Sequence, residues 1–170
     1  ISTFGGFLKL WREGDIFRRA EVRVRGELPV VIAYVERKVT TKEMVGRVKN
    51  LLERYGALVE GIMDLIGKVT LRAEEALSRG DLETVGELMN INQGLLEALG
   101  VSDIRLSELT HVARSAGALG AKLTGAGGGG AIIALAPSNA DKVEVALRLK
   151  ASLTLRTAFG VEGVRFEKVQ

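Results

Sequence analysis

Five glycines lie among the six residues from Gly125 to Gly130, at the centre of the segment AKLTGAGGGGAIIALA that covers residues 121–136. Glycine loses more backbone freedom on folding than other residues, so a run of glycines inside a folded domain needs a physical reason. One reason is anion binding, because successive backbone N–H groups of such a loop can converge on phosphate oxygens that a Cβ atom would keep away. The other is very close packing of the backbone against a neighbour. The residue types themselves leave both open.

The glycine run does not fit a linker, a Walker A loop or a dinucleotide-binding turn well. A flexible linker usually mixes serine with polar residues and separates domains, whereas this run lies between two apolar segments. A Walker A loop requires Gly-Lys-Ser or Gly-Lys-Thr after the glycines, and a dinucleotide-binding turn requires a helix there. The apolar segment AIIALA follows instead, so we predict a loop between two strands.

Hydrophobic periodicity and capping signals predict the elements that hold this loop. Alternating or β-branched segments indicate strands at 7–11, 17–24 and 28–35, of which the last is a central strand covered on both faces. Thr40 and Glu43 have the spacing of a capping box, which predicts a helix up to about residue 55. Further helices are predicted at about 58–78, 81–99, 103–118 and 138–151, and strands at 122–124, 131–136 and 161–169. The fold class is therefore α+β, with an antiparallel sheet covered by helices.

Composition narrows the classes of function. The chain has 170 residues, with 24 Lys and Arg against 21 Asp and Glu, and a net charge of +3 does not argue for nucleic acid or a membrane surface as partner. Cysteine is absent, and no apolar stretch approaches the length that spans a bilayer, so we expect a cytoplasmic protein. Because the sequence starts at Ile1 and enters a strand at once, we expect it to be the C-terminal part of a longer polypeptide.

Two motifs resemble those of a known family. The residues KLTGAGGGGA at 122–131 resemble the third conserved motif of the GHMP small-molecule kinases, although Ala131 stands where the family often has cysteine. The residues ISTFGG at 1–6 are similar to the segment that follows the catalytic aspartate in the mevalonate kinases of that family, including the archaeal type. The resemblance covers essentially the whole chain, as the C-terminal half of such an enzyme.

The resemblance implies a fold and an activity. Residues 36–170 would form the ferredoxin-like C-terminal domain of a GHMP kinase, and residues 1–35 would be β segments that continue from a missing N-terminal half. The complete enzyme would transfer a phosphoryl group from ATP to the primary hydroxyl of mevalonate, in isoprenoid biosynthesis. A sibling kinase that acts on phosphomevalonate or homoserine remains an alternative, as does a non-catalytic binding or oligomerisation module.

The resemblance also assigns roles to residues. The catalytic base would be an aspartate just upstream of Ile1, so the chain itself would hold no catalytic residue and would be inactive alone. Ser2, Thr3 and Thr41 would lie near the mevalonate-like substrate. Mg²⁺ would arrive with ATP and find its protein ligands mainly in the missing half, and a homodimer is left open. The residues that would contact ATP phosphates, or brace the missing phosphate loop, are Thr124, Gly125, Ala126, Gly127, Gly128, Gly129 and Gly130.

Some residues allow both a functional and a structural interpretation. The capping box accounts for Thr40, and Lys122 is either solvated or able to steer a phosphate. Asn90, Asn92 and Gln93 interrupt an otherwise apolar helix, for which we consider a hydrogen-bonding role between helices or in a cleft. Gly128→Val is predicted to damage nucleotide use with little loss of folding, on the assumption that the loop lies open to a cleft.

Overall fold

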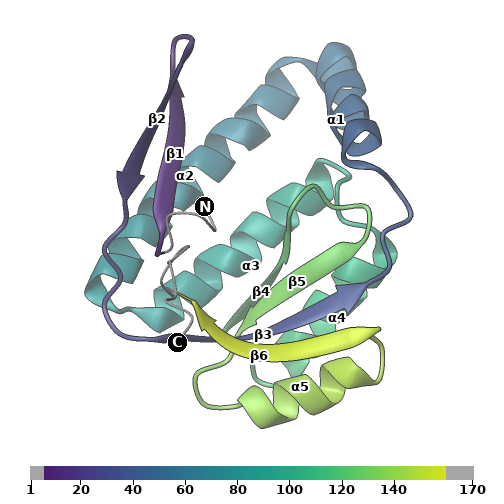
Figure 1. Ribbon diagram of the computed structural model, residues 1–170. Coiled ribbons are helices and arrows are strands. Elements are labelled where there is room, and N and C mark those ends of the chain that lie inside the picture. The colour runs from purple at the N-terminus through teal and green to yellow at the C-terminus, as the bar shows by residue number, and fades with distance from the viewer. Residues whose placement is uncertain (1–5, 160–170) are drawn as a thin grey trace, which may run out of the picture.

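The structure is a computed structural model that describes residues 6–159 (Figure 1). Its elements are β1 (Leu8–Glu13), β2 (Ile16–Glu21), β3 (Leu28–Val35), α1 (Thr41–Tyr55), α2 (Ala57–Arg79), α3 (Leu82–Ala98), α4 (Ile104–Ser115), β4 (Gly120–Thr124), β5 (Gly130–Leu135), α5 (Ala140–Arg148) and β6 (Leu153–Phe159). The expected mixture of helices with antiparallel sheets is confirmed. Strand 161–169 of the prediction lies outside the described residues.

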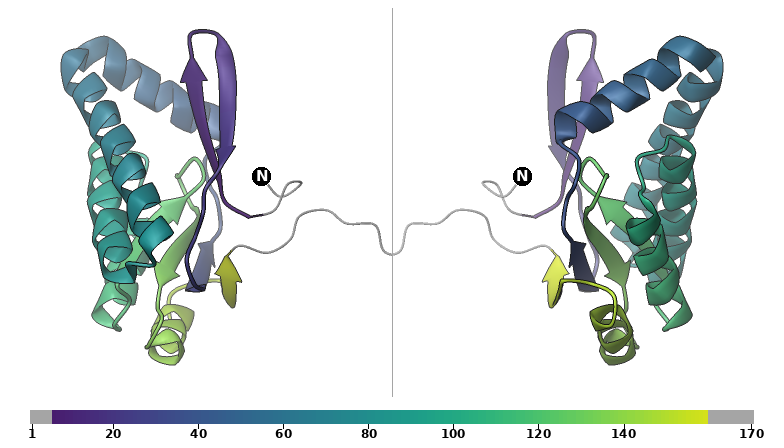
Figure 2. Two further views of the ribbon diagram at one scale, coloured as in Figure 1. Left: turned by 90° about the vertical axis from the view of Figure 1, so that its left-hand side faces the viewer. Right: turned by 90° about the vertical axis from the view of Figure 1, so that its right-hand side faces the viewer.

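Strands β1 and β2 form a hairpin that projects beside α2, away from the rest of the molecule (Figures 1 and 2). Its two-residue turn pairs Glu13 with Ile16, and Gly14 supplies the positive φ of 59° that such a turn needs. The prediction of a half-buried strand at 17–24 is wrong in this respect, because every residue of β2 is exposed. Val22 and Val24 lie beyond the strand and are partly buried at the base of the hairpin.

The main sheet has the strand order β4-β5-β3-β6, and all of its neighbouring strands are antiparallel. The chain passes through β3, the helices α1 to α4, then β4, β5, α5 and β6. This is the β-α-β-β-α-β arrangement of a ferredoxin-like fold, with additional helices before β4. Residues before position 36 therefore supply both the separate hairpin and β3, one of the two inner strands of the sheet. The division of the chain at residue 35 stays a prediction.

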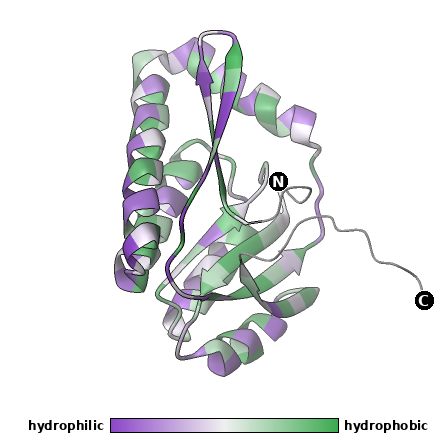
Figure 3. Cartoon of the chain, turned by 60° about the vertical axis from the view of Figure 1, so that its left-hand side comes forward, coloured by the Kyte–Doolittle hydropathy of each residue, from purple (hydrophilic) through white to green (hydrophobic). Residues whose placement is uncertain are grey.

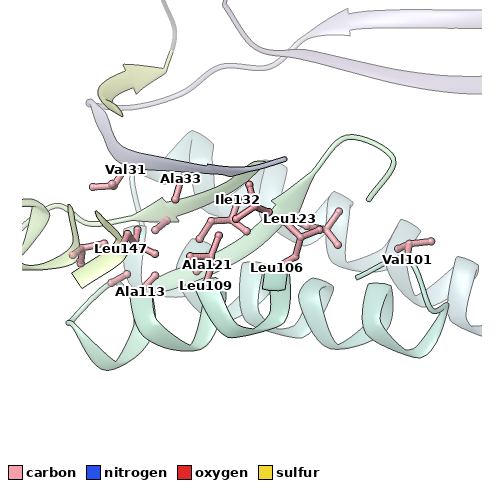
Figure 4. Close-up of a cluster of buried hydrophobic side chains, with 14 of the residues drawn as sticks. Val31, Ala33, Val101, Leu106, Leu109, Ala113, Ala121, Leu123, Ile132 and Leu147 are labelled. Atoms are coloured by element: carbon pink, nitrogen blue, oxygen red, sulfur yellow. The ribbon is translucent and has the colours of Figure 1, made fainter. Parts of the chain in front are cut away.

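One face of the sheet packs on α4 and α5 (Figure 4). The side chains between these layers come from alternate positions of the strands, including Val31 and Ala33 of β3 and Ile132 of β5, and each is fully buried. Leu106 and Leu109 of α4 and Leu147 of α5 meet them from the helical side. Apolar colouring accordingly follows the strands of the sheet, whereas the hairpin and the outer helices are mixed (Figure 3).

Local sequence signals place several helix ends as predicted. Thr40 and Glu43 form the complete capping box of α1, and Asp81 and Asp103 cap α3 and α4 through their carboxylates. Helix α5 differs from the prediction because it begins at Ala140, after Asn139, and not at residue 138. Among the described residues no helix combines the length and apolar character that crossing a membrane requires.

Helix α3 lies against the outer edge of β4, where its amide side chains replace the missing neighbouring strand. Asn90 donates to the Leu119 carbonyl at 3.1 Å and accepts from the Ala121 amide at 3.1 Å. Gln93, only 1% exposed, accepts from the Leu123 amide at 2.8 Å. Exposed strand edges and buried amides both need partners, so these bonds explain two polar residues in an apolar helix.

Strand β6 was not predicted, and its pattern explains why. Its face toward α5 carries Arg156, which pairs with Glu144 and Asp141 of that helix, while Leu153 and Leu155 point to the other face and are exposed. Polar residues therefore lie on the covered side, which is the reverse of an ordinary half-buried strand. Glu144 is also paired with Arg148 and its side chain is only 8% exposed.

The pairs of Glu144 predict an acid-sensitive contribution to stability. The hydrogen bond from Arg156, assisted by Arg148, lowers the pKa of Glu144 below its usual value of 4.5. Stabilisation is therefore fully present above the unfolded-state pKa and is lost as the pH falls through the lower pKa of the folded state. We expect Glu144→Gln to reduce the thermal unfolding temperature at pH 7, with a difference from wild type that disappears in acid.

Glu53→Gln provides the matched control for this measurement. Glu53 is also in an i,i+4 pair, with Lys49 at 3.7 Å, but its side chain is 61% exposed. Exposed pairs contribute little to stability, so Glu53→Gln should leave the unfolding temperature nearly unchanged at both pH values. Equal losses for the two variants at pH 7 would contradict the special role of Glu144.

Candidate functional site

The glycine run forms the connection between β4 and β5. Gly125, Gly127, Gly128, Gly129 and Gly130 all have positive φ, between 69° and 103°, a region that side-chain-bearing residues rarely adopt. The Gly128 amide donates to the Val101 carbonyl at 3.0 Å and ties the loop to the segment that precedes α4. Glycine is thus required here by backbone conformation.

Four of these glycines are also buried in close packing. A Cβ atom on Gly127 would lie 2.0 Å from the Val101 carbonyl oxygen, and one on Gly128 would lie 2.8 Å from Sδ of Met44. A Cβ atom on Gly129 would lie 2.8 Å from Cα of Arg37. The expectation that Gly128 lies open to a cleft is therefore wrong, because protein atoms already occupy the space beside it.

The start of the loop is accessible. Thr124 and Gly125 are exposed and Ala126 is half-buried. Gly125 and Ala126 line one end of a mostly apolar groove of about 360 Å³, whose other walls come from α1, α2 and the segment 96–101. The remaining lining residues are Met44, Val45, Val48, Lys49, Leu52, Met63, Leu96, Leu99 and Val101. Of the predicted phosphate-contacting residues, those at 124–126 can therefore be reached from outside.

Two polar side chains of the segment after β3 lie at the loop. Thr41 is the exposed first residue of α1, and its hydroxyl accepts a 3.3 Å hydrogen bond from Nη1 of Arg37. A Cβ atom on Gly125 or Gly130 would lie 3.4 or 3.3 Å from Nη2 of the same arginine. The sequence pointed to Thr41 but not to Arg37, which the pairing of Val35 with Gly130 brings to the loop.

The side chain of Lys122 makes a hydrogen bond within the fold. Its ammonium group donates to the Leu123 carbonyl at 2.8 Å, and burial lowers its pKa. One donor is thus used within its own strand, and the side-chain hydrogen bonds of the described residues include none from Lys122 to the loop. Ser2 and Thr3, the remaining predicted substrate residues, lie outside the described residues.

Two carboxylates near the loop, those of Asp103 and Glu43, are engaged in the fold. Asp103 caps α4 through the Leu106 amide at 3.0 Å and pairs with Arg105 at 2.7 Å. Glu43 is held by the backbone and hydroxyl of Thr40, each at 2.7 Å, and these bonds lower its pKa. Across residues 6–159, no three acidic, histidine or cysteine side chains gather into a set that could hold a metal ion.

The family profile described as GHMP kinases C terminal matches residues 73–154, which include α3, α4, the glycine loop, α5 and the start of β6. The chain carries a GHMP kinase C-terminal domain. Curated relatives extend the similarity beyond this GHMP kinase domain. The mevalonate kinase of Pyrococcus abyssi is 43% identical over 100% of the chain and that of Pyrococcus horikoshii 44% identical over 99%.

Solved structures share the fold of the GHMP kinase domain. The crystal structure of L. major mevalonate kinase in complex with R-mevalonate matches 95% of the chain with a TM-score of 0.88 and 27% identity. Streptococcus pneumoniae phosphomevalonate kinase matches 83% with a TM-score of 0.67 and 18% identity, which supports the fold alone. The chain spans about half the length of the curated relatives it matches: 51% of the P. abyssi protein and 50% of the P. horikoshii protein.

Proposed function

We propose that the chain is the C-terminal half of an ATP-dependent mevalonate kinase. The observation that carries this proposal is the similarity to archaeal mevalonate kinases, above 40% identity, along the entire chain and not only in the glycine loop. The accessible start of that loop, with Thr41 and Arg37 beside it, supports a site for anionic groups.

The proposed reaction transfers the γ-phosphoryl group of ATP. The oxygen of the primary hydroxyl of mevalonate forms a bond to the γ-phosphorus, the bond from that phosphorus to the bridging β,γ oxygen breaks, and ADP leaves with its electron pair. The hydroxyl proton passes to a base, which we place on an aspartate upstream of Ile1. Such transfers depend chiefly on alignment of the reactants and on stabilisation of the transferred charge.

Within this reaction, the loop residues divide into two groups. Thr124, Gly125 and Ala126 would offer a hydroxyl and backbone amides to phosphate oxygens, or to the loop that carries them in the missing half. Residues 127–130 would act by holding the first residues of the loop, 124–126, in place. Gly127 and Gly128 pack closely against Val101 and Met44. Thr41, and Ser2 and Thr3 outside the described residues, remain proposed contacts to the substrate.

The described residues do not fit a dedicated Mg²⁺ site, because among residues 6–159 no three acidic, histidine or cysteine side chains gather into a set that could hold a metal ion, and Asp103 and Glu43 are already paired. We propose that Mg²⁺ arrives bound to ATP phosphates and takes any carboxylate ligand from the missing half, a mode that suits its preference for phosphate oxygens and water. The missing half is thus a partner of this chain. A cytoplasmic location and a homodimer remain proposals, with no role for nucleic acid or membrane.

A substrate panel with the full-length polypeptide tests the function. We expect ATP-dependent phosphorylation of mevalonate with kcat/KM at least about a hundredfold above that for homoserine or phosphomevalonate, since a site built around one substrate's polar groups rejects analogues strongly. ADP release measures the rate, and the 170-residue chain alone serves as control with no expected turnover. Preferred turnover of homoserine or phosphomevalonate would assign a sibling kinase instead, and no turnover of any substrate would favour a binding module.

A further inference from the structure

Arg37 lies across both ends of the glycine loop. It follows β3 by two positions, and the pairing of Val35 with Gly130 sets it beside the point where the loop enters β5. Its Nη2 atom is 3.3 Å from where a Cβ atom of Gly130 would be and 3.4 Å from that of Gly125. The guanidinium is therefore within contact distance of both glycines, at the two ends of the loop.

The charge of Arg37 is not neutralised by the described part of the chain. Among residues 6–159 it forms no ion pair, and its side chain makes a single long hydrogen bond to the Thr41 hydroxyl, at 3.3 Å. The second guanidinium at the loop differs in this respect, because Arg105 is paired with Asp103 at 2.7 Å. Glu43 is committed to the cap of α1. Of the two guanidinium groups beside the loop, that of Arg37 is therefore the one whose donors are largely unused.

A guanidinium presents a planar fork of donors that matches two oxygens of a phosphate or a carboxylate. At this loop it lies next to the Thr41 hydroxyl and close to the accessible residue Gly125. We propose that Arg37 binds the anionic oxygens of a ligand at the glycine loop, either a nucleotide phosphate or the carboxylate of the acceptor. This inference rests on the proposed kinase function and adds a binding residue to it.

The test uses the full-length polypeptide with Arg37→Met, Arg37→Lys and the neighbouring control Lys38→Met. A charge-assisted hydrogen bond to a ligand corresponds to about a tenfold to hundredfold effect on affinity. We expect Arg37→Met to raise KM by this factor and Arg37→Lys to recover part of the loss. Lys38→Met should change KM less than about twofold, because a general positive field falls off with distance and salt. The unfolding temperature of all three variants should match wild type.

The two KM measurements, one for ATP and one for mevalonate, identify the ligand. An increase in KM for ATP assigns the phosphate, and an increase in KM for mevalonate assigns the carboxylate. If Arg37→Met leaves KM unchanged for both ATP and mevalonate, the proposal is overturned. It is also overturned if Arg37→Met only loses stability. If the wild-type polypeptide phosphorylates no acceptor, the kinase proposal fails, and calorimetric titration with ATP, tripolyphosphate and mevalonate still decides the role of Arg37. Weaker binding of any of these anions to Arg37→Met, with no such loss for Lys38→Met, supports it, and equal binding to both variants rejects it.

Discussion

Gly86→Ala is expected to lower the free energy of unfolding by about 3 kcal/mol, the upper part of the range for overpacking a core. Gly86 lies in α3 where the helix meets β4 backbone to backbone. A Cβ atom there would lie 2.6 Å from Cβ and 2.7 Å from the carbonyl carbon and oxygen of Leu119. Helix α3 and strand β4 cannot easily move apart, because Asn90 of α3 is hydrogen-bonded to the strand edge at Leu119 and Ala121, on both sides of Gly120. The loss can be measured by urea denaturation followed by circular dichroism.

Gly94→Ala makes the same chemical change on the same helix and should have the opposite sign. No atom would lie within 4 Å of its Cβ, outside the helix's own backbone and chain neighbours. Alanine restricts the unfolded chain more than glycine does, so a gain of about 0.5–1 kcal/mol is expected. If both variants are stabilised, then α3 and β4 are farther apart than the structure has them.

Gly128→Val is expected to destabilise the fold by about 3 kcal/mol, from a strained backbone together with overpacking. Its φ is +69°, and a Cβ would lie 2.8 Å from Sδ of Met44 and 3.1 Å from Cβ of Val39. This replaces the sequence-based expectation of intact folding. Thermal unfolding should be measured beside ATP affinity per folded molecule of the full-length polypeptide.

Gly125→Ala separates nucleotide contact from packing. Gly125 has a positive φ of 81°, but it is exposed and only the Arg37 guanidinium would approach its Cβ, at 3.4 Å. We expect the free energy of unfolding to fall by about 1 kcal/mol because of backbone strain. The proportional loss of ATP affinity should be larger than this proportional loss of stability.

The contradicting outcome for Gly128→Val is a protein that keeps wild-type stability but loses ATP affinity. That result would restore the hypothesis of an open loop and refute the close packing of Gly128 against Met44.

Local signals in the sequence predicted much of the fold. The capping box of Thr40 and Glu43 is complete within four residues, so the start of α1 needs no tertiary information. The apolar run of β3 likewise indicates a central strand. Strand β6 could not be recognised in this way, because its covered face bears Arg156 and depends on Glu144 of another element for its charge balance.

The candidate site was predicted in part. The glycine loop stands out in the sequence, but whether glycines contact a ligand or the protein itself depends on what lies beside them. Val101 and Met44, which fill that space for Gly127 and Gly128, are distant in sequence and carry no signal of this role. Arg37 reaches the loop only through the register of β3 against β5, and Gln93 and Asn90 acquire their meaning only beside β4.

The projecting hairpin has a practical consequence for anyone who isolates this part of the polypeptide. In the described residues β1 and β2 pair with each other alone, so each strand leaves one row of backbone donors and acceptors facing water. Phe17, near its tip, is 80% exposed. An uncovered ribbon of this kind is a template for recruiting strands from other molecules. Self-association of the purified fragment would therefore start at this hairpin. Substitution of an exposed edge residue of the hairpin by lysine would be the first change to make if the fragment precipitates.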